Sequence, residues 1–288
     1  MPQREAPAPP APHPDSLTGL QPRGGPGDRL ARELGHEGRA NRLWLASLTV
    51  WLTVLIVTPI SIWLAGESAF LLMANVGVLA QAAAVLLALA GCWPARRTAT
   101  VSAITLAGTW GVERLGSTTG IPFGRYAYTG ALQPQIGGVP LLIPLAWLMM
   151  LAPAWAAADA LLAPFWERLR GWQRPLSAAL AGGAFDACDL YLDPQIVARG
   201  LWVWESPGGY FGIPWVNFLG WWGAAALLTL LIRPADLPRR RLLVIYTLTW
   251  LFQAVGLGVF WEQPGPALVG FVGMGLFAGL AWRGEARR

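Results

Sequence analysis

The sequence contains no lysine: its 21 basic residues are all arginine, against 16 acidic residues in a chain of 288. A Schiff base with retinal needs a lysine, so a rhodopsin-like bundle is excluded. The two histidines, His13 and His36, lie near the start of the chain, which leaves the rest without imidazole ligands for haem, di-iron or zinc. No Gly-rich dinucleotide or phosphate-binding motif occurs. We therefore predict a protein that uses neither a metal nor an organic cofactor.

Charge of either sign is also scarce. Only 13% of the residues are charged and 55% are hydrophobic, whereas a soluble domain carries roughly 25% charged residues. The arginines separate apolar runs instead of forming a basic patch on a polar fold, which argues against nucleic-acid binding. Cys92 and Cys188 both lie in apolar surroundings, so no disulfide is needed. This composition predicts a membrane protein.

The first 42 residues differ from the rest of the chain. They are rich in Pro, Gly, Arg and Glu with few large apolar residues, so they cannot bury enough surface to offset chain entropy. We predict a disordered tail over 1–42. The first apolar run begins at Leu43 and is about 23 residues long, which is a membrane span and exceeds the roughly 7 to 15 residues of a cleavable signal core. A short basic tail is expected at 283–288.

The remaining chain divides into apolar segments near the ~20 residues that cross a bilayer. The predicted spans are 43–65, 69–92, 98–113, 139–163, 175–193, 210–232, 242–261 and 265–282. If the N-terminal tail is cytoplasmic, eighteen arginines fall on the inner side and three, Arg114, Arg125 and Arg199, on the outer side. Cytoplasmic loops retain positive charge. The sequence therefore predicts an all-α, multi-pass integral membrane bundle over 43–282 in the cell membrane, with about eight transmembrane helices and both termini cytoplasmic.

Acidic residues are concentrated in the stretch GAFDACDLYLDP (183–194). At 100° per residue, Asp186, Asp189 and Asp193 fall within about 60° of one helix face. An ionisable group in hydrocarbon is costly and usually marks a function. Two structural explanations remain open: Asp193, followed by Pro194, could end the helix at the interface, and the other two aspartates could form interhelical hydrogen bonds. A fourth acid, Glu113, ends the third predicted span.

Two long loops on the predicted outer side flank these acids, over 113–147 and 193–222, and each contains Gly-Ile-Pro. Aromatic residues gather in them, including Tyr126, Tyr128, Tyr210, Trp202 and Trp204. They could form the aromatic belt of a membrane interface. Alternatively, they could line a pocket in which an aromatic face stabilises a carbocation.

The motifs GIPFGRYAY (120–128), GGVPLLIPLAW (137–147), DLYLDP (189–194) and YFGIPWVNFLGWW (210–222) resemble the carotenoid 1,2-hydratase family of membrane proteins. The resemblance is specific over about 100–230 and looser to about 282. It implies a cofactor-independent enzyme that adds water across the terminal C1,C2 double bond of an acyclic carotenoid end group, giving a tertiary alcohol. Gamma-carotene, lycopene-type ends and C50 bacterioruberin precursors are the substrates that it implies.

The acids suit this chemistry. The reaction needs an acid that protonates C2, surroundings that tolerate a cation at C1 and a base that takes a proton from the incoming water. Two carboxyls close together at low dielectric cannot both ionise, so one keeps its proton. We predict Asp186 and Asp189 as this pair, with Glu113 or Asp193 positioning water. The other candidate site residues are expected around the end group and the water: Tyr126, Tyr128, Trp202, Trp204, Tyr210 and Asn217.

Two other functions use similar residues. A carotenoid or isoprenoid cyclase or isomerase would start from the same protonation, and a transporter could also need intramembrane acids. A transporter should carry polar residues along its whole path, whereas the acids here concentrate toward one side. The expected partners are a carotenoid within the bilayer and, by extension, other enzymes of the same pathway.

Overall fold

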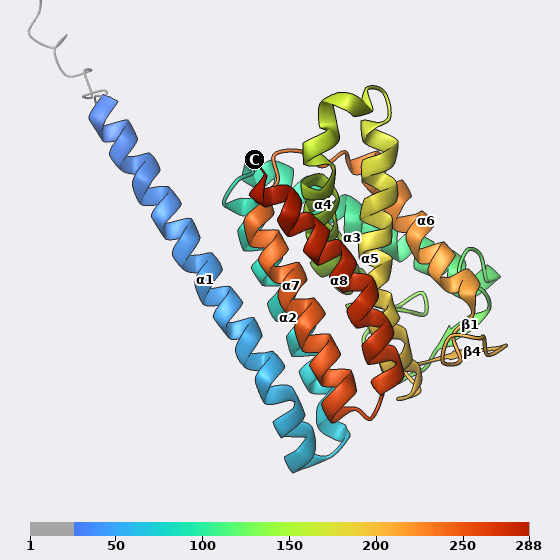
Figure 1. Cartoon of the computed structure of the whole chain (residues 1–288). Helices are drawn as coiled ribbons and strands as arrows, with labels where there is room; N and C mark the ends of the chain where they lie inside the picture. Colours follow the sequence, from blue (N-terminus) through green and yellow to red (C-terminus); the bar gives the residue numbers. More distant parts are fainter. Residues whose placement is uncertain (1–25, 288) are drawn as a thin grey trace, which may run out of the picture. The chain divides into compact units, whose positions relative to one another are not determined.

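The computed structural model describes residues 26–287, and their side chains from residue 38. A boundary between two units of the chain falls after residue 39, and residues 40–287 form the helical bundle. The helices and strands of the described residues (Figure 1) are α1 (Pro26–Ala65), α2 (Ser68–Ala90), α3 (Ala95–Thr119), β1 (Tyr126–Tyr128), β2 (Gln135–Ile136), β3 (Val139–Pro140), α4 (Leu142–Leu162), η2 (Ala163–Leu169), α5 (Gln173–Val197), β4 (Trp202–Trp204), α6 (Trp215–Ile232), α7 (Arg239–Val255), η3 (Gly256–Phe260) and α8 (Pro264–Ala286).

The predicted all-α membrane bundle is confirmed. The described residues contain eight α-helices, and six of them, α1, α2, α4, α6, α7 and α8, are long and apolar enough to cross a membrane. The other two, α3 and α5, carry Glu113 and the three clustered aspartates within their length. The two helices that are not counted among the six apolar membrane-crossing helices are therefore the ones that carry the candidate acids.

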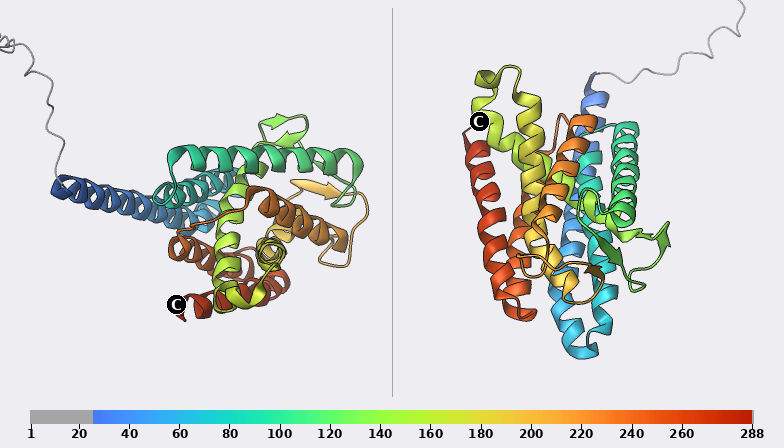
Figure 2. Two further views of the ribbon diagram at one scale, coloured as in Figure 1. Left: turned by 90° about the horizontal axis from the view of Figure 1, so that it is seen from above. Right: turned by 90° about the vertical axis from the view of Figure 1, so that its right-hand side faces the viewer.

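Helix α4 forms the centre of the bundle. It is apolar on all sides, which is typical of a helix with no solvent-facing surface, and most of its residues are buried. It packs against α2, α3, α5, α7 and α8, and seen from above it lies between α3 and α8 (Figure 2). Five of the other helices are thus held together through α4, while α6 packs on α5 and α3.

Several boundaries in the structure differ from the predicted ones. Helix α1 begins at Pro26, so 26–42 is helical where a disordered tail was expected, because Arg, Leu, Ala and Glu in this stretch are good helix formers. The rest of that predicted tail, 1–25, lies outside the described residues. Helix α8 continues to Ala286, into the predicted basic tail. Helix α3 extends past residue 113 to Thr119, so Glu113 lies inside it.

The end of α5 also differs from the prediction. The helix passes through Pro194 and ends at Val197, so Asp193 is an interior, buried residue. A proline inside a helix removes the hydrogen bond to the carbonyl four residues earlier, which is that of Leu190. The Tyr210 hydroxyl donates to this carbonyl oxygen at 2.8 Å. A side chain from the following loop thus replaces the missing backbone donor, and the helix continues.

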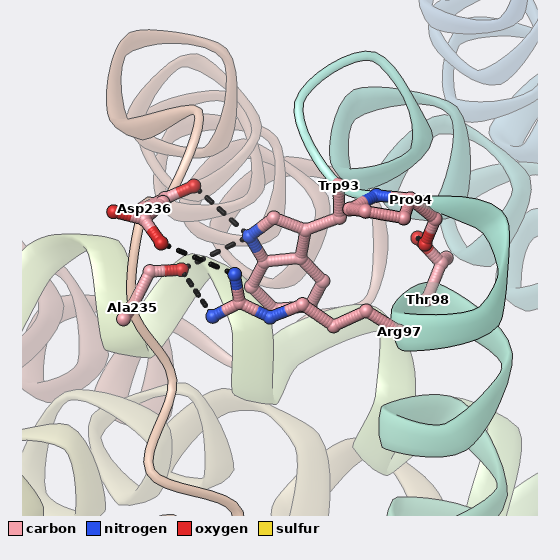
Figure 3. A network of polar contacts seen from close by, with 6 residues as sticks. All are labelled: Trp93, Pro94, Arg97, Thr98, Ala235 and Asp236. Carbon is pink, nitrogen blue, oxygen red and sulfur yellow. Dashed lines mark hydrogen bonds and ion pairs between the residues drawn. The ribbon is translucent and has the colours of Figure 1, made fainter.

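The two ends of the bundle differ in character. We call the end where α2, α4, α6 and α8 terminate the arginine end. There the Trp93 indole donates to the Ala235 and Asp236 carbonyl oxygens, both at 2.9 Å, and the Arg97 guanidinium stacks 4.4 Å above the Trp93 ring and pairs with Asp236 at 3.2 Å (Figure 3). The α2–α3 and α6–α7 connections therefore meet at one end of the bundle. The predicted alternation of loops between the two sides of the membrane requires them to lie on the same side.

At the opposite end, which we call the ribbon end, α3 and α5 terminate and α4 and α6 begin. The two long loops are joined here: β1 pairs antiparallel with β4, so that Tyr126 lies opposite Trp204 and Tyr128 opposite Trp202. The ring centroids of these cross-strand pairs are 5.2 and 5.9 Å apart, and such aromatic pairs stabilise a two-stranded ribbon. The ribbon brings the loop after α3 next to the loop after α5.

Candidate active site

Two carboxyl groups and one amide form a buried cluster between α5 and α6. Asp189, Asp193 and Asn217 are 2%, 1% and 1% exposed. The Asn217 Nδ2 group donates to Asp193 Oδ2 and lies 3.4 Å from Asp189 Oδ2. Because Asn217 occupies the first turn of α6, the packing of α6 on α5 brings the amide to both acids.

The carboxyl groups of Asp189 and Asp193 lie close together, because both approach the same Asn217 amide nitrogen. Two buried carboxyls this close cannot both ionise, so one of the two keeps a proton. Asp189 Oδ1 is buried and has no protein partner. The cluster therefore offers a shared proton and a free carboxyl oxygen beside it.

This pairing differs from the predicted one. Asp186 is one turn earlier on α5 and only partly buried, and its buried Oδ1 has no partner. Asp193 lies four residues after Asp189, nearly in line with it along the helix, and Asn217 bridges these two. The prediction paired Asp186 with Asp189, whereas in the structure the Asn217 amide joins Asp189 to Asp193. Asp186 remains on the same face as a neighbouring third acid.

Glu113 forms a second polar centre, on α3. Its Oε2 accepts hydrogen bonds from the Tyr126 and Tyr128 hydroxyls, both at 2.6 Å, and its Oε1 accepts from the Trp147 indole at 3.2 Å. Burial and the nearby Glu113 carboxylate raise the pKa of Tyr126 above its ordinary value, and the same holds for Tyr128. Both tyrosines therefore stay protonated and act as donors to the Glu113 carboxyl beside the aspartate pair.

The remaining predicted site residues have different surroundings. Trp202 is buried on β4 and packs on Tyr128. Trp204 is buried with an unpartnered indole nitrogen and packs on Tyr126. Tyr210 uses its hydroxyl on the Leu190 carbonyl, so it supports α5 rather than contacting the acids through that group.

An aromatic stack next to the acids was not predicted as part of the site. The Trp147 ring stacks on Trp221 with centroids 4.7 Å apart, and Phe185 packs on both, at 4.6 and 5.7 Å. These rings come from α4, α6 and α5 respectively. Trp147 lies in the GGVPLLIPLAW motif, but nothing in the local sequence says that its indole would reach a carboxylate 34 positions earlier.

An apolar cavity of about 380 Å³ lies next to Trp202, which forms part of its wall. Its walls come from α1, α2, α4, α5, α7 and η3, and it includes Trp202 as the only member of the predicted substrate-binding set. We call it the apolar cavity. The acids themselves are not among its lining residues.

Within the described part of the chain, no three His, Cys, Asp or Glu side chains are grouped so that they could hold a metal ion. The polar groups of the cluster are carboxyls, one amide and phenol or indole donors. This set can move a proton between carboxyl oxygens, bind a water molecule and place aromatic faces beside a developing positive charge.

Comparison with known proteins places this arrangement in context. The model of the carotenoid biosynthesis protein family matches residues 73–277. A bisanhydrobacterioruberin hydratase from Haloarcula japonica is 34% identical over 113 residues, which are 39% of this chain and 36% of that protein. The alignment thus spans little more than a third of the relative's length. No solved structure matches. Since the family model covers more than half of the chain and includes every acid of the site, the protein belongs to the carotenoid biosynthesis protein family.

Proposed function

We propose that this protein hydrates the terminal C1,C2 double bond of an acyclic carotenoid end group, of the gamma-carotene or lycopene type, and that the Asp189–Asp193 pair performs the reaction. The observation that carries the proposal is the contact of the Asn217 amide with two buried carboxyls, which cannot both ionise so close together. Family membership and the hydratase name of a partial relative support the substrate class and the reaction type.

The first step is proton transfer. The Asn217 amide donates to Asp193 and so favours its charged form, which leaves the proton with Asp189. The π electrons of the substrate take this proton at C2, a C2–H bond forms, and a tertiary cation remains at C1. General acid catalysis of this kind contributes roughly 10²- to 10⁴-fold to a rate.

The second step is water capture. A water oxygen forms the bond to C1 and its proton passes to a carboxylate of the pair, so the product is a tertiary alcohol and the pair is restored. The aromatic rings of Trp147 and Trp221, whose centroids lie 4.7 Å apart, stabilise the cation. Asp186, with its unpartnered oxygen, holds the incoming water.

Expression in a host that accumulates lycopene or gamma-carotene tests the proposal. A hydratase adds the mass of one water to the pigment for each end hydrated. A cyclase would change the absorption spectrum while leaving the mass unchanged, and an unchanged pigment would contradict any enzymatic role on these substrates.

A further inference from the structure

The apolar cavity has the size and chemistry of a binding site for a hydrocarbon. Its volume of about 380 Å³ falls in the range of small-molecule pockets, roughly 300 to 1,000 Å³. Its amide groups satisfy one another or neighbouring groups: Gln81 donates to Thr249 at 3.1 Å, and Gln195 donates to Gln253 at 3.2 Å. A ligand therefore does not need polar groups to match the walls.

The cavity is elongated along the helices. On α2 its lining extends from Phe70 to Gln81, and on α1 from Trp51 to Pro59. At 1.5 Å per residue, the first of these stretches is about 16 Å long. Such a shape fits a linear chain better than a compact ring system.

One part of the cavity adjoins the acid pair. Leu192 and Trp202 line it. Leu192 directly precedes Asp193 in the chain, and Trp202 lies opposite Tyr128, whose hydroxyl donates to Glu113. Trp202 therefore forms the wall between the apolar cavity and the acids. A chain held in the cavity would direct one end toward the pair once this indole moves aside.

Another part of the cavity faces the membrane. Ile56 on α1, Val255 at the end of α7 and Phe260 on η3 all line it, and they are 54%, 50% and 52% exposed on the bundle surface. Element η3 is a π-helix, a local widening that is frequent at functional sites. These lining residues lie where the apolar interior of the bilayer would contact the bundle.

We propose that the apolar cavity holds the polyene chain of the substrate, which enters sideways from the lipid between α1 and η3. This assignment rests on the proposed function, because the occupant is the chain whose end group reaches the acid pair. An acyclic carotenoid dissolved in the bilayer then reaches the site without crossing water, and Trp202 separates the bound chain from the acids until the end group arrives.

Two substitutions test the cavity. Gly77→Leu fills it, since a Cβ at this position meets only Val54 Cγ1 at 3.8 Å, and Val255→Trp narrows its membrane-facing mouth. The matched controls are Gly279→Leu on α8, where nothing lies within 4 Å of a built Cβ, and Leu276→Trp, which is 61% exposed on the same helix. Each full-length variant is expressed in the carotenoid-accumulating host, purified in detergent and checked for thermal unfolding.

We expect hydration and the amount of carotenoid that copurifies per protein to fall together, by about tenfold or more, in Gly77→Leu and Val255→Trp. Both controls should stay within about twofold of the unmodified protein. If the unmodified protein hydrates the pigment and both cavity variants do so equally well, the cavity proposal is overturned while the proposed function stands. If the unmodified protein hydrates nothing, the proposed function fails, and the cavity proposal is then judged by the copurified pigment alone. Equal amounts of pigment in all variants overturn the cavity proposal. A loss of pigment in Gly77→Leu and Val255→Trp but not in the controls supports it.

Discussion

Asp189 and Asp193 illustrate how a single amide changes the chemistry of two acids. Both are almost fully buried, and Asn217 contacts both. A buried carboxylate without a partner is very costly, so the amide and the shared proton together make this burial tolerable. In the proposed reaction the same features serve proton transfer, because one member keeps a proton while the other accepts one.

We expect Asp189→Asn and Asp193→Asn each to lower the rate of hydration by about 10²-fold or more, because the amide cannot donate an acidic proton or accept one from water. Pigment mass and conversion in the carotenoid-accumulating host measure the effect. Asp236→Asn is the matched control, since its carboxyl is 82% exposed and pairs only with Arg97, an arrangement of little energetic value. Unchanged conversion in both site variants would reject the pair as the acid and base.

Tyr210 has a role in folding that its place in an aromatic-rich loop conceals. Its hydroxyl supplies the donor that Pro194 cannot give to the Leu190 carbonyl. Without it, a buried carbonyl next to the acid pair would be unsatisfied, which costs about 1–3 kcal/mol. The position of Asp193 therefore depends on a tyrosine from another part of the chain.

Tyr210→Phe should lower the free energy of unfolding by about 1–3 kcal/mol, measured by thermal unfolding in detergent. Pro194→Ala restores a backbone N–H at position 194, so the double variant should regain much of this loss. A cycle over the two single variants and the double variant isolates the coupling. Additive effects would show that the hydroxyl and the proline are independent.

At the scale of elements, the approach of α5 to α6 determines the site. A Cβ built on Gly182 would lie 2.6 Å from the Trp222 carbonyl oxygen, so only a glycine permits this separation of the two helices. The same interface carries the aspartates on α5 and Asn217 on α6. Small residues serve this purpose at many interfaces between membrane helices.

Gly182→Ala should push α6 away from α5, cost about 1–3 kcal/mol of stability and lower hydration, because the amide loses its position over the acids. Thermal unfolding and pigment conversion report the two effects. Gly223→Ala on α6 provides the comparison: no atom lies within 4 Å of its built Cβ, so stability should be equal or higher and conversion unchanged. Equal behaviour of the two variants would refute a packing role for Gly182.

For the whole molecule, charge separates the two ends of the bundle. The arginine end holds ion pairs between Arg239 and Asp159 at 2.8 Å and between Arg239 and Glu285 at 3.4 Å, which connect α4, α7 and α8. The ribbon end holds the aromatic loops and lies nearer to the acid pair. By the rule that cytoplasmic loops retain positive charge, we expect the arginine end to face the cytoplasm.

The two cysteines provide a test of this orientation. Cys92 is exposed at the arginine end, whereas Cys188 is buried. A thiol reagent that does not cross membranes should leave Cys92 unlabelled in intact cells and label it after permeabilisation. Ala131→Cys at the ribbon end, in a Cys92→Ser background, should show labelling in intact cells. The reverse pattern would invert the orientation, and Cys92→Ser alone controls for labelling of Cys188.

Composition and periodicity were enough to predict a bundle of about eight helices, the alternation of its loops and a single helix face for Asp186, Asp189 and Asp193. These properties depend on residues close together in the chain. Local patterns gave a different helix end where a distant residue takes part. The predicted span stopped at residue 193, before Pro194, but Tyr210 compensates for the proline and α5 continues.

The partners of the acids were decided by packing. Asn217 bridges Asp189 and Asp193 from another helix, and Glu113 takes its donors from a strand and from α4. The apolar cavity depends on six helical elements and on Trp202 of β4. No local pattern contains this information, because helix periodicity says which residues share a face, whereas the burial of apolar surface and the close approach at Gly182 determine which faces meet.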